Sequence, residues 1–227
     1  MTEPALTPIS SLGPIEPERS RSGKRVLLVM LAIVVLGAIP AVVIPMMWQR
    51  GKPPKLVDMG ALPSFRLTDE RGHVFTEDAF RHQQTIVGFV FTRCDTICPV
   101  TSMKMENVQD QTFDVGKKVK LVSFSVDPEY DTPERLAAYA QRFKADPERW
   151  RFVTGPKTQV TQLVESGFMA SMQREGDRPS GVPDIAHAAY FLLVDGDLHI
   201  RGRYDSNDVN EIAQMMRAAR YLARISN

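Results

Sequence analysis

Cysteine is scarce in this chain, and the little there is lies in one place. The 227 residues include 2 cysteines, Cys94 and Cys98. Structural zinc sites usually take four ligands from two closely spaced pairs, so the lack of a second pair argues against structural zinc. A disulfide that closes so short a loop adds little stability through chain entropy, although a purely structural bridge remains an alternative. We therefore interpret the two cysteines as one site, either a redox dithiol or a metal clip.

Long runs of one charge sign are also missing. The 28 Lys and Arg residues nearly balance the 27 Asp and Glu residues, giving a formal net charge of +1. The sequence shows no basic stripe, no long acidic run and no internal repeat. Because nucleic-acid-binding domains gather basic side chains on one surface, this composition predicts no nucleic acid partner.

One long apolar run is present near the N-terminus. Residues 26–48 are almost entirely apolar, and a helix of that length crosses a hydrocarbon core of ~30 Å. A secretory signal peptide is the rival interpretation, but its apolar region is only about 7–15 residues long. The flanking charges show a small excess on the N-terminal side: Arg19, Arg21, Lys24 and Arg25 precede the run, and Arg50, Lys52 and Lys55 follow it. This bias favours a cytoplasmic N-terminus, a single span of the inner (cytoplasmic) membrane and a soluble domain on the periplasmic or extracytoplasmic side.

The span divides the chain into four parts. Residues 1–25 are rich in proline and lack apolar periodicity, so they are expected to form a disordered cytoplasmic tail. Residues 26–48 form the transmembrane anchor and residues 49–60 a linker. The remaining residues, 61–227, have the size of one domain with its own core.

The pattern beyond the linker alternates strands with helices. Two apolar runs, 86–91 and 120–126, are typical of central strands covered on both faces. Residues 99–113 between them predict a helix, so both cysteines lie where a strand turns into a helix. Further expected elements are a hairpin over 64–76, a helix that begins after Thr132, strands over 189–194 and 198–204, and a last helix with the buried stripe Val209, Ile212, Ala213, Met216 and Ala219. This order predicts an α/β fold.

The position of the cysteine pair has chemical consequences. Backbone N–H groups and the helix dipole at a helix start favour thiolate, so at least one cysteine is expected to be unusually reactive. Thiolates are soft ligands that suit Cu(I) or zinc, and two sulfurs leave room for a third ligand. Of the four histidines, His73, His82 and His199 are expected at the surface. His187, just ahead of a buried strand, could face the thiols as a third ligand, but the residues alone favour a core histidine that is hydrogen-bonded to the backbone.

Three motifs in order resemble the Sco/SenC family. They are the strand and Cys-x-x-x-Cys-Pro turn over 89–99, the Ser-Val-Asp-Pro segment within 123–134, and a lone histidine before an apolar strand. The resemblance, which spans residues 60–225, implies a membrane-anchored protein with a thioredoxin-like fold that binds copper, as Cu(I), Cu(II) or both. The ligands it implies are Cys94, Cys98 and His187. It also implies as partners a thiol reductant and the copper-bearing subunit of cytochrome c oxidase, whose binuclear copper centre the family helps to assemble, or another copper protein.

The chain departs from the family pattern beside two of these ligands. Asp95 stands where the family usually has proline after the first cysteine, and Ala186 stands where it usually has aspartate before the histidine. Asp127, in the Ser-Val-Asp-Pro segment, is expected as an acid near the site.

Two other functions fit the same fold. A thiol–disulfide oxidoreductase that reduces a membrane partner protein needs only Cys94 and Cys98 as its catalytic dithiol and gives His187 no role. A peroxidase would use Thr92 and Arg93 beside a single nucleophile. Because soft ligands select Cu(I), the sequence favours a copper chaperone over an enzyme.

Overall fold

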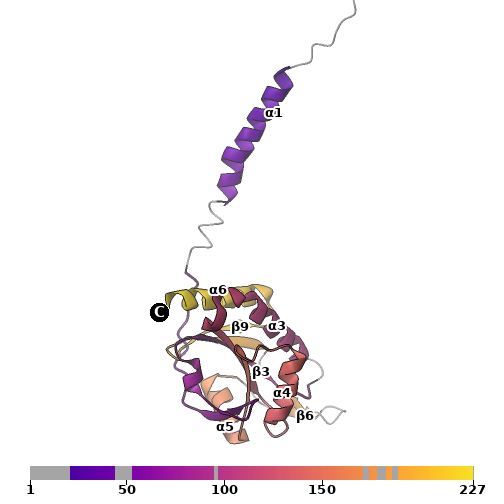
Figure 1. Cartoon of the computed structure of the whole chain (residues 1–227), viewed down its shortest axis with the longest axis vertical. Coiled ribbons are helices and arrows are strands. Elements are labelled where there is room, and N and C mark those ends of the chain that lie inside the picture. Colours follow the sequence, from indigo (N-terminus) through magenta and orange to yellow (C-terminus); the bar gives the residue numbers. More distant parts are fainter. Residues whose placement is uncertain are drawn as a thin grey trace, which may run out of the picture. The chain divides into compact units, whose positions relative to one another are not determined.

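The computed structural model of this chain describes residues 21–43, 53–94, 97–170, 174–177, 183–185 and 189–226. By its contacts the chain forms two compact units, Met1–Lys52 and Pro53–Asn227. The described part of the first unit is a helix, in which α1 (Arg21–Ile33) continues through the π-helical η1 (Val34–Ala38) (Figure 1). The stretch Gly23–Val43 is long and apolar enough to cross a membrane, and its side chains are not buried against the protein. The last residues of the predicted span, 44–48, lie outside the described residues.

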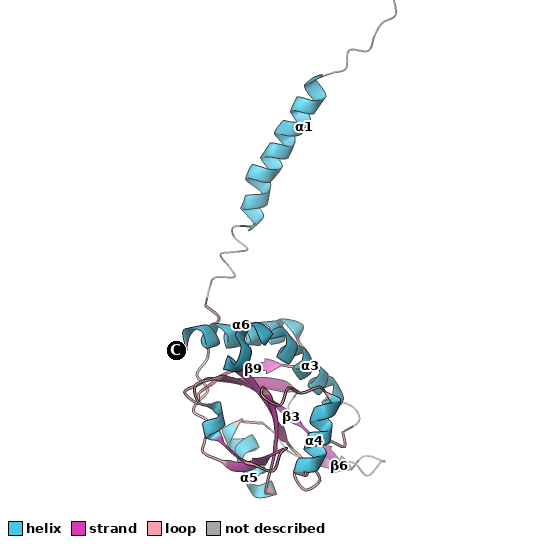
Figure 2. Ribbon diagram, in the orientation of Figure 1, coloured by secondary structure: helices cyan, strands magenta, loops and turns pink. Residues whose placement is uncertain are grey.

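The second unit is built on one mixed sheet of seven strands in the order β2-β1-β5-β4-β3-β8-β9 (Figure 2). Its strands are β1 (Arg66–Asp69), β2 (Val74–Thr76), β3 (Gln84–Val90), β4 (Val119–Ser125), β5 (Trp150–Thr154), β8 (Tyr190–Val194) and β9 (Ile200–Asp205), and a separate ladder joins β6 (Arg174–Asp177) to β7 (Pro183–Ile185). The helices are α3 (Ile97–Gln111), α4 (Pro133–Arg142), α5 (Lys157–Gln162) and α6 (Val209–Ile225), with the short segments η2 (Glu77–Phe80), η3 (Phe113–Lys118) and η4 (Leu163–Gly167). The predicted α/β fold is confirmed.

The middle of the sheet places the cysteines. All seven residues of β3 are buried. This strand runs parallel to β4 and antiparallel to β8, so it is paired on both edges. Helices α3 and α6 pack against β3, while α4 packs against β5. A strand covered on both faces must be apolar throughout, which is why residues 86–91 read as a continuous apolar run.

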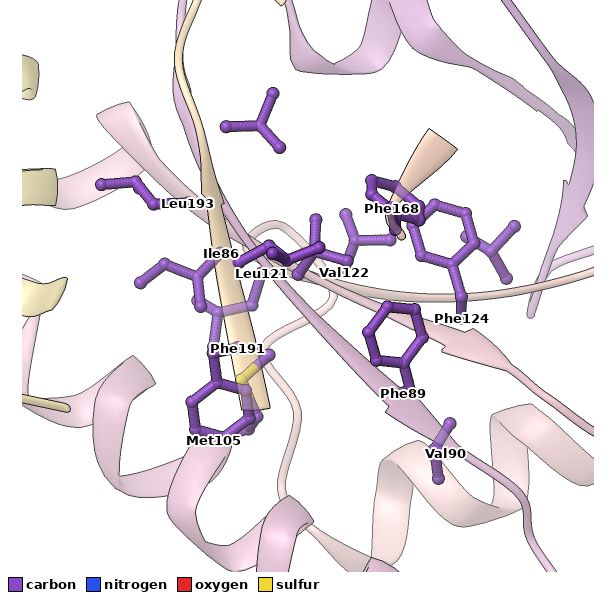
Figure 3. Close-up of a cluster of buried hydrophobic side chains, with 14 of the residues drawn as sticks. Ile86, Phe89, Val90, Met105, Leu121, Val122, Phe124, Phe168, Phe191 and Leu193 are labelled. Carbon is purple, nitrogen blue, oxygen red and sulfur yellow. The ribbon is translucent and has the colours of Figure 1, made fainter. Parts of the chain in front are cut away.

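Aromatic rings fill the core around β3 (Figure 3). Phe89 of β3 packs near Phe168, with ring centroids 5.9 Å apart, and Phe168 lies 5.1 Å from Phe124 of β4. On α3, Met105 is 1% exposed beside Phe191. These contacts pack β3 against β4 and the middle of α3, and so support the end of β3 where the cysteine turn begins.

The helix ends follow local sequence signals, with one error. Thr132 accepts a hydrogen bond from the Arg135 backbone N–H, and Pro133 is the first residue of α4, as predicted. The predicted stripe of α6 is wrong at its start, because Val209 is 75% exposed. The buried face of α6 consists instead of Met215, Met216, Ala218, Ala219, Leu222 and Ala223, so the helix packs through its C-terminal half.

Candidate metal and redox site

The two cysteines lie at the end of the central strand, as predicted. Cys94 follows β3 in a turn, in which its backbone N–H donates to the Phe91 carbonyl at 3.2 Å. Cys98 is the second residue of α3. Both are in the thiol form, and they are only 4% and 1% exposed. The strand, the turn and the helix start therefore bring two buried sulfurs to one place.

Cys98 does not have the stabilised thiolate that its place in the helix predicts. Its pKa is raised, first by a side-chain hydrogen bond with Cys94, then by burial and by the charge of Cys94, while a backbone hydrogen bond from Phe91 acts in the opposite direction. Two thiols this close cannot both ionise easily, so Cys98 retains its proton. At least one of the two cysteines is expected to be unusually reactive, and the raised pKa shows that Cys98 is not that cysteine. A soft cation that replaces the protons of both thiols would relieve this conflict.

A buried carboxylate, not singled out by the sequence, anchors the cysteine turn. Asp131 is 0% exposed. It accepts hydrogen bonds from the Thr92 backbone N–H at 3.1 Å and the Thr92 hydroxyl at 2.6 Å, and from the Ser125 hydroxyl at 2.5 Å. Burial raises the pKa of Asp131, and these hydrogen bonds oppose that rise. Since Thr92 is two residues before Cys94, Asp131 ties the turn to the end of β4.

A second acid holds the next residue of the turn. The Arg93 guanidinium donates to the Asp127 carboxylate at 2.5 Å and also lies 4.6 Å from the centre of the Tyr130 ring. Asp127 is 7% exposed, which agrees with its expected place near the site. Thr92 and Arg93, the groups that a peroxidase would need, therefore both bond to carboxylates of the segment after β4. This arrangement gives the peroxidase alternative no support.

The helix side of the pair faces a buried tyrosine. The Ser102 and Tyr139 hydroxyls are 2.9 Å apart. Burial is the largest cause that raises the pKa of Tyr139, and the charges of Cys98 and Cys94 add to it. Tyr139 is therefore close enough to interact electrostatically with both cysteines, and α4, which carries it, lies beside them.

The described histidines lie away from the cysteines. The His73 side chain is 74% exposed, and His82 is also at the surface. The His199 ring is 38% exposed, and its Nδ1 lies 3.0 Å from the Asp58 carboxylate. These three surface predictions are confirmed. Among the described residues no third histidine, cysteine, aspartate or glutamate joins the cysteines in a cluster that could hold a metal ion; His187 lies outside them, as do Asp95 and Ala186.

Strand β8 approaches the cysteine turn from the other side. The antiparallel register pairs Val87 with Leu192, and further along β3 the ring of Phe89 lies 6.0 Å from that of Tyr190. The start of β8 is therefore beside the end of β3, where the cysteine turn begins. His187 precedes Tyr190 by three residues in the sequence.

The raised pKa of Cys98 predicts that the reduced protein loses stability in alkali. Above its ordinary pKa of 9.0, the thiol ionises in the unfolded chain but keeps its proton in the folded one. The unfolded state then binds fewer protons, so stability falls by about 1.4 kcal/mol per pH unit, whereas below that pH the contribution is fully present. Urea unfolding without oxygen at about pH 8 and about pH 10 should show this extra loss. A Cys98→Ala variant should not show it, and an equal loss in both proteins would contradict the shift.

A mixed sheet with two thiols at the turn from its central strand into a helix defines a thioredoxin-like domain with a dithiol site. The family model described as SCO1/SenC matches residues 58–223. The chain belongs to the SCO1/SenC family.

Known relatives agree with this placement. The SCO1 protein homolog of Bacillus subtilis is 28% identical over 134 residues, which cover 59% of this chain and 67% of that protein. The structure of Bradyrhizobium japonicum ScoI with copper bound has a TM-score of 0.61 and 24% identity, over 73% of this chain and 99% of that one. The structure of BsSco, a member of the Sco family of cytochrome c oxidase assembly proteins in which a disulfide switch was identified, has a TM-score of 0.64 and 22% identity, over 74% and 97% of the two chains.

Proposed function

We propose that this protein is a membrane-anchored copper chaperone that holds one copper ion through Cys94, Cys98 and His187. It delivers the ion to the copper-bearing subunit of cytochrome c oxidase or to another copper protein. The observation that carries the proposal is the pair of buried thiols, hydrogen-bonded to each other, at the end of β3 in a SCO1/SenC domain. Sulfur ligands select Cu(I) over magnesium or calcium.

The place of β8 supports His187 as the third ligand. Three residues of extended chain reach at most about 10 Å, and Tyr190, three residues after His187, packs against Phe89 beside the cysteine turn. A histidine at that distance along the chain can reach the sulfurs. Two sulfurs and one nitrogen leave copper accessible to the thiolates of a partner, so the ion moves by ligand exchange.

The chemistry of the pair makes copper loading depend on redox state. Copper binding displaces the protons of both thiols, so affinity should fall as the pH falls. Oxidation joins Cys94 to Cys98 through loss of two electrons and two protons, and the resulting disulfide has no thiolate to offer. A thiol reductant is therefore a required partner.

The apolar helix of residues 23–43 is long enough to cross a bilayer. The whole apolar run of residues 26–48 is longer than the apolar region of about 7–15 residues in a signal peptide, which supports a membrane anchor. The small excess of basic residues before the run supports a dithiol domain on the extracytoplasmic side. Tethering keeps the site close to a membrane-bound acceptor and raises its effective concentration there.

Copper titration of a reduced fragment, residues 53–227, under anaerobic conditions tests the ligand set. The core side chains all belong to this unit. We expect one copper per chain in the wild type and binding at least about 10-fold weaker in His187→Ala, since even outer-shell partners of a metal are worth ~10–100-fold. His199→Ala is the matched control and should bind like the wild type. Equal affinity of wild type and His187→Ala would remove His187 from the site.

A thiol–disulfide oxidoreductase is the second candidate, because the side chains of Cys94 and Cys98 are close enough to hydrogen-bond and so could form and open a disulfide. In that case the acceptor would be a disulfide in a membrane partner protein, and the two electrons and two protons of Cys94 and Cys98 would pass to it. The same titration distinguishes the two functions. A reductase predicts weak copper binding with no effect of His187→Ala, together with rapid reduction of a partner disulfide.

A further inference from the structure

An apolar and basic surface lies one helix length away from the cysteines. Helix α3 begins at the dithiol and ends just before η3, and its 15 residues span about 22 Å. Segment η3 contacts the last helix, α6. Together they form what we call the Phe113 patch, which consists of Phe113, Lys117, Lys118, Arg220, Arg224 and Ile225.

Two large apolar side chains of this patch are open to solvent. Phe113 is 78% exposed and Ile225 is 57% exposed. The two segments that carry them are joined by the Lys118 ammonium, which donates to the Ser226 carbonyl at 3.2 Å. Phe113 and Ile225 are therefore exposed on two segments that this hydrogen bond joins, and large apolar side chains exposed in one region mark a contact surface.

Basic side chains surround these apolar groups. Arg220 lies 3.0 Å from the Asp114 carboxylate and Arg224 lies 3.8 Å from it, and Lys117 lies 3.3 Å from Glu148. Arg217 lies on the same face of α6, one turn before Arg220 and two turns before Arg224, and is also exposed. The patch thus keeps more basic than acidic groups, although residues 53–227 as a whole carry slightly more acidic side chains than basic ones.

We propose that the Phe113 patch docks on the surface of an anionic lipid bilayer. Aromatic and aliphatic side chains enter the boundary between headgroups and acyl chains, while lysine and arginine remain with the lipid phosphates. This partner fits both the apolar and the basic groups, and the proposed membrane anchor, on which this inference rests, keeps such a surface within reach. The 9 residues from 44 to 52 precede the second unit and can extend over about 31 Å, so the tether permits the contact.

Docking in this way would orient the copper site. Because α3 leads from the patch to Cys98, the dithiol would lie no farther than about 20 Å from the docked patch. The acceptor site would then lie on a membrane protein within that reach of the bilayer surface.

The first test uses the full chain in nanodiscs of phosphatidylcholine with and without phosphatidylglycerol, followed by amide hydrogen exchange. We expect residues 111–118 and 217–226 to exchange at least about threefold more slowly when phosphatidylglycerol is present. A second test measures sedimentation of residues 53–227 with vesicles of the same two compositions. This fragment lacks the anchor, so failure of the anchor assignment and failure of the patch give different results.

Variants identify the side chains of the patch that contribute to lipid binding. Lys117→Glu with Lys118→Glu should weaken binding to phosphatidylglycerol vesicles at least about 10-fold, since each basic group near an anionic surface contributes roughly 5-fold. Phe113→Ser should weaken it about 5-fold, because the serine has no apolar ring to enter the boundary between headgroups and acyl chains. The charge-matched control is Lys144→Glu with Lys157→Glu, and the apolar control is Val209→Ser, at a residue 75% exposed. Both controls should change binding less than twofold.

Two results would overturn the proposal. One is binding that does not depend on phosphatidylglycerol or on the patch variants. The other is unchanged lipid binding combined with slower copper transfer in the Lys117→Glu, Lys118→Glu variant, which would make the patch a docking site for an acidic protein.

Discussion

A Cys98→Ser variant should lose copper binding while the domain still folds. Serine has nearly the shape of cysteine, so the buried site, where Cys98 is 1% exposed, can keep its packing. Its hydroxyl does not ionise near neutral pH and is a hard ligand that Cu(I) disfavours. We expect affinity to fall by more than about 100-fold, beyond the ~10–100-fold that loss of an outer-shell partner costs. Anaerobic titration against a Cu(I) chelator of known affinity measures this.

The matched control changes another buried polar side chain of the same helix. Ser102 lies one turn after Cys98, and its hydroxyl is 2.9 Å from that of Tyr139. Ser102→Ala should leave the stoichiometry unchanged and alter the affinity only slightly. If Cys98→Ser kept wild-type affinity, or if Ser102→Ala lost copper equally, the two-sulfur site would be wrong.

An Asp131→Ala variant should be the most destabilised single variant near the site. The substitution removes the Asp131 carboxylate, and this leaves the Thr92 N–H, the Thr92 hydroxyl and the Ser125 hydroxyl without their acceptor in the protein interior. Buried donors left unsatisfied cost about 1–3 kcal/mol each, and partial relaxation around the gap should bring the total to about 3 kcal/mol. Urea unfolding of the reduced protein at neutral pH measures the loss.

An Asp131→Asn variant separates hydrogen bonding from charge. Asparagine can still accept from the Thr92 N–H, and its amide can donate to a hydroxyl, so we expect a loss of only about 1 kcal/mol. Because burial raises the pKa of Asp131 above its ordinary 3.8, the folded protein holds this proton to a higher pH than the unfolded chain. The protonated Asp131 therefore makes its full contribution to the free energy of unfolding below about pH 4, and this contribution decreases as the pH rises toward the pKa of the folded state. Asp131→Asn should abolish that slope. A loss as large as that of Asp131→Ala would show that the turn needs both acceptor oxygens of the carboxylate, because asparagine keeps the shape of the side chain.

The sequence alone located the cysteine site because its signals are local. An apolar run, a turn with Cys94 and Cys98, and a following helix are neighbours in the chain, so strand and helix periodicity place them without tertiary information. The same holds for the Thr132 cap and for the long apolar helix near the N-terminus. The order of strands and helices read from the sequence correctly predicted the α/β fold.

Only the tertiary structure showed what surrounds the sulfurs. Asp131 and Thr92 are 39 residues apart, and Arg93 and Asp127 are 34 apart. No local sequence pattern predicts such pairs, because each pair forms only when β4 lies parallel to β3. The raised pKa of Cys98 has a local and a tertiary cause: the hydrogen bond with Cys94, four residues away, is the largest, and burial in the folded domain adds to it. Local sequence determined where the thiols are and that they lie together, and long-range packing decided how deeply they are buried and which side chains hold the turn.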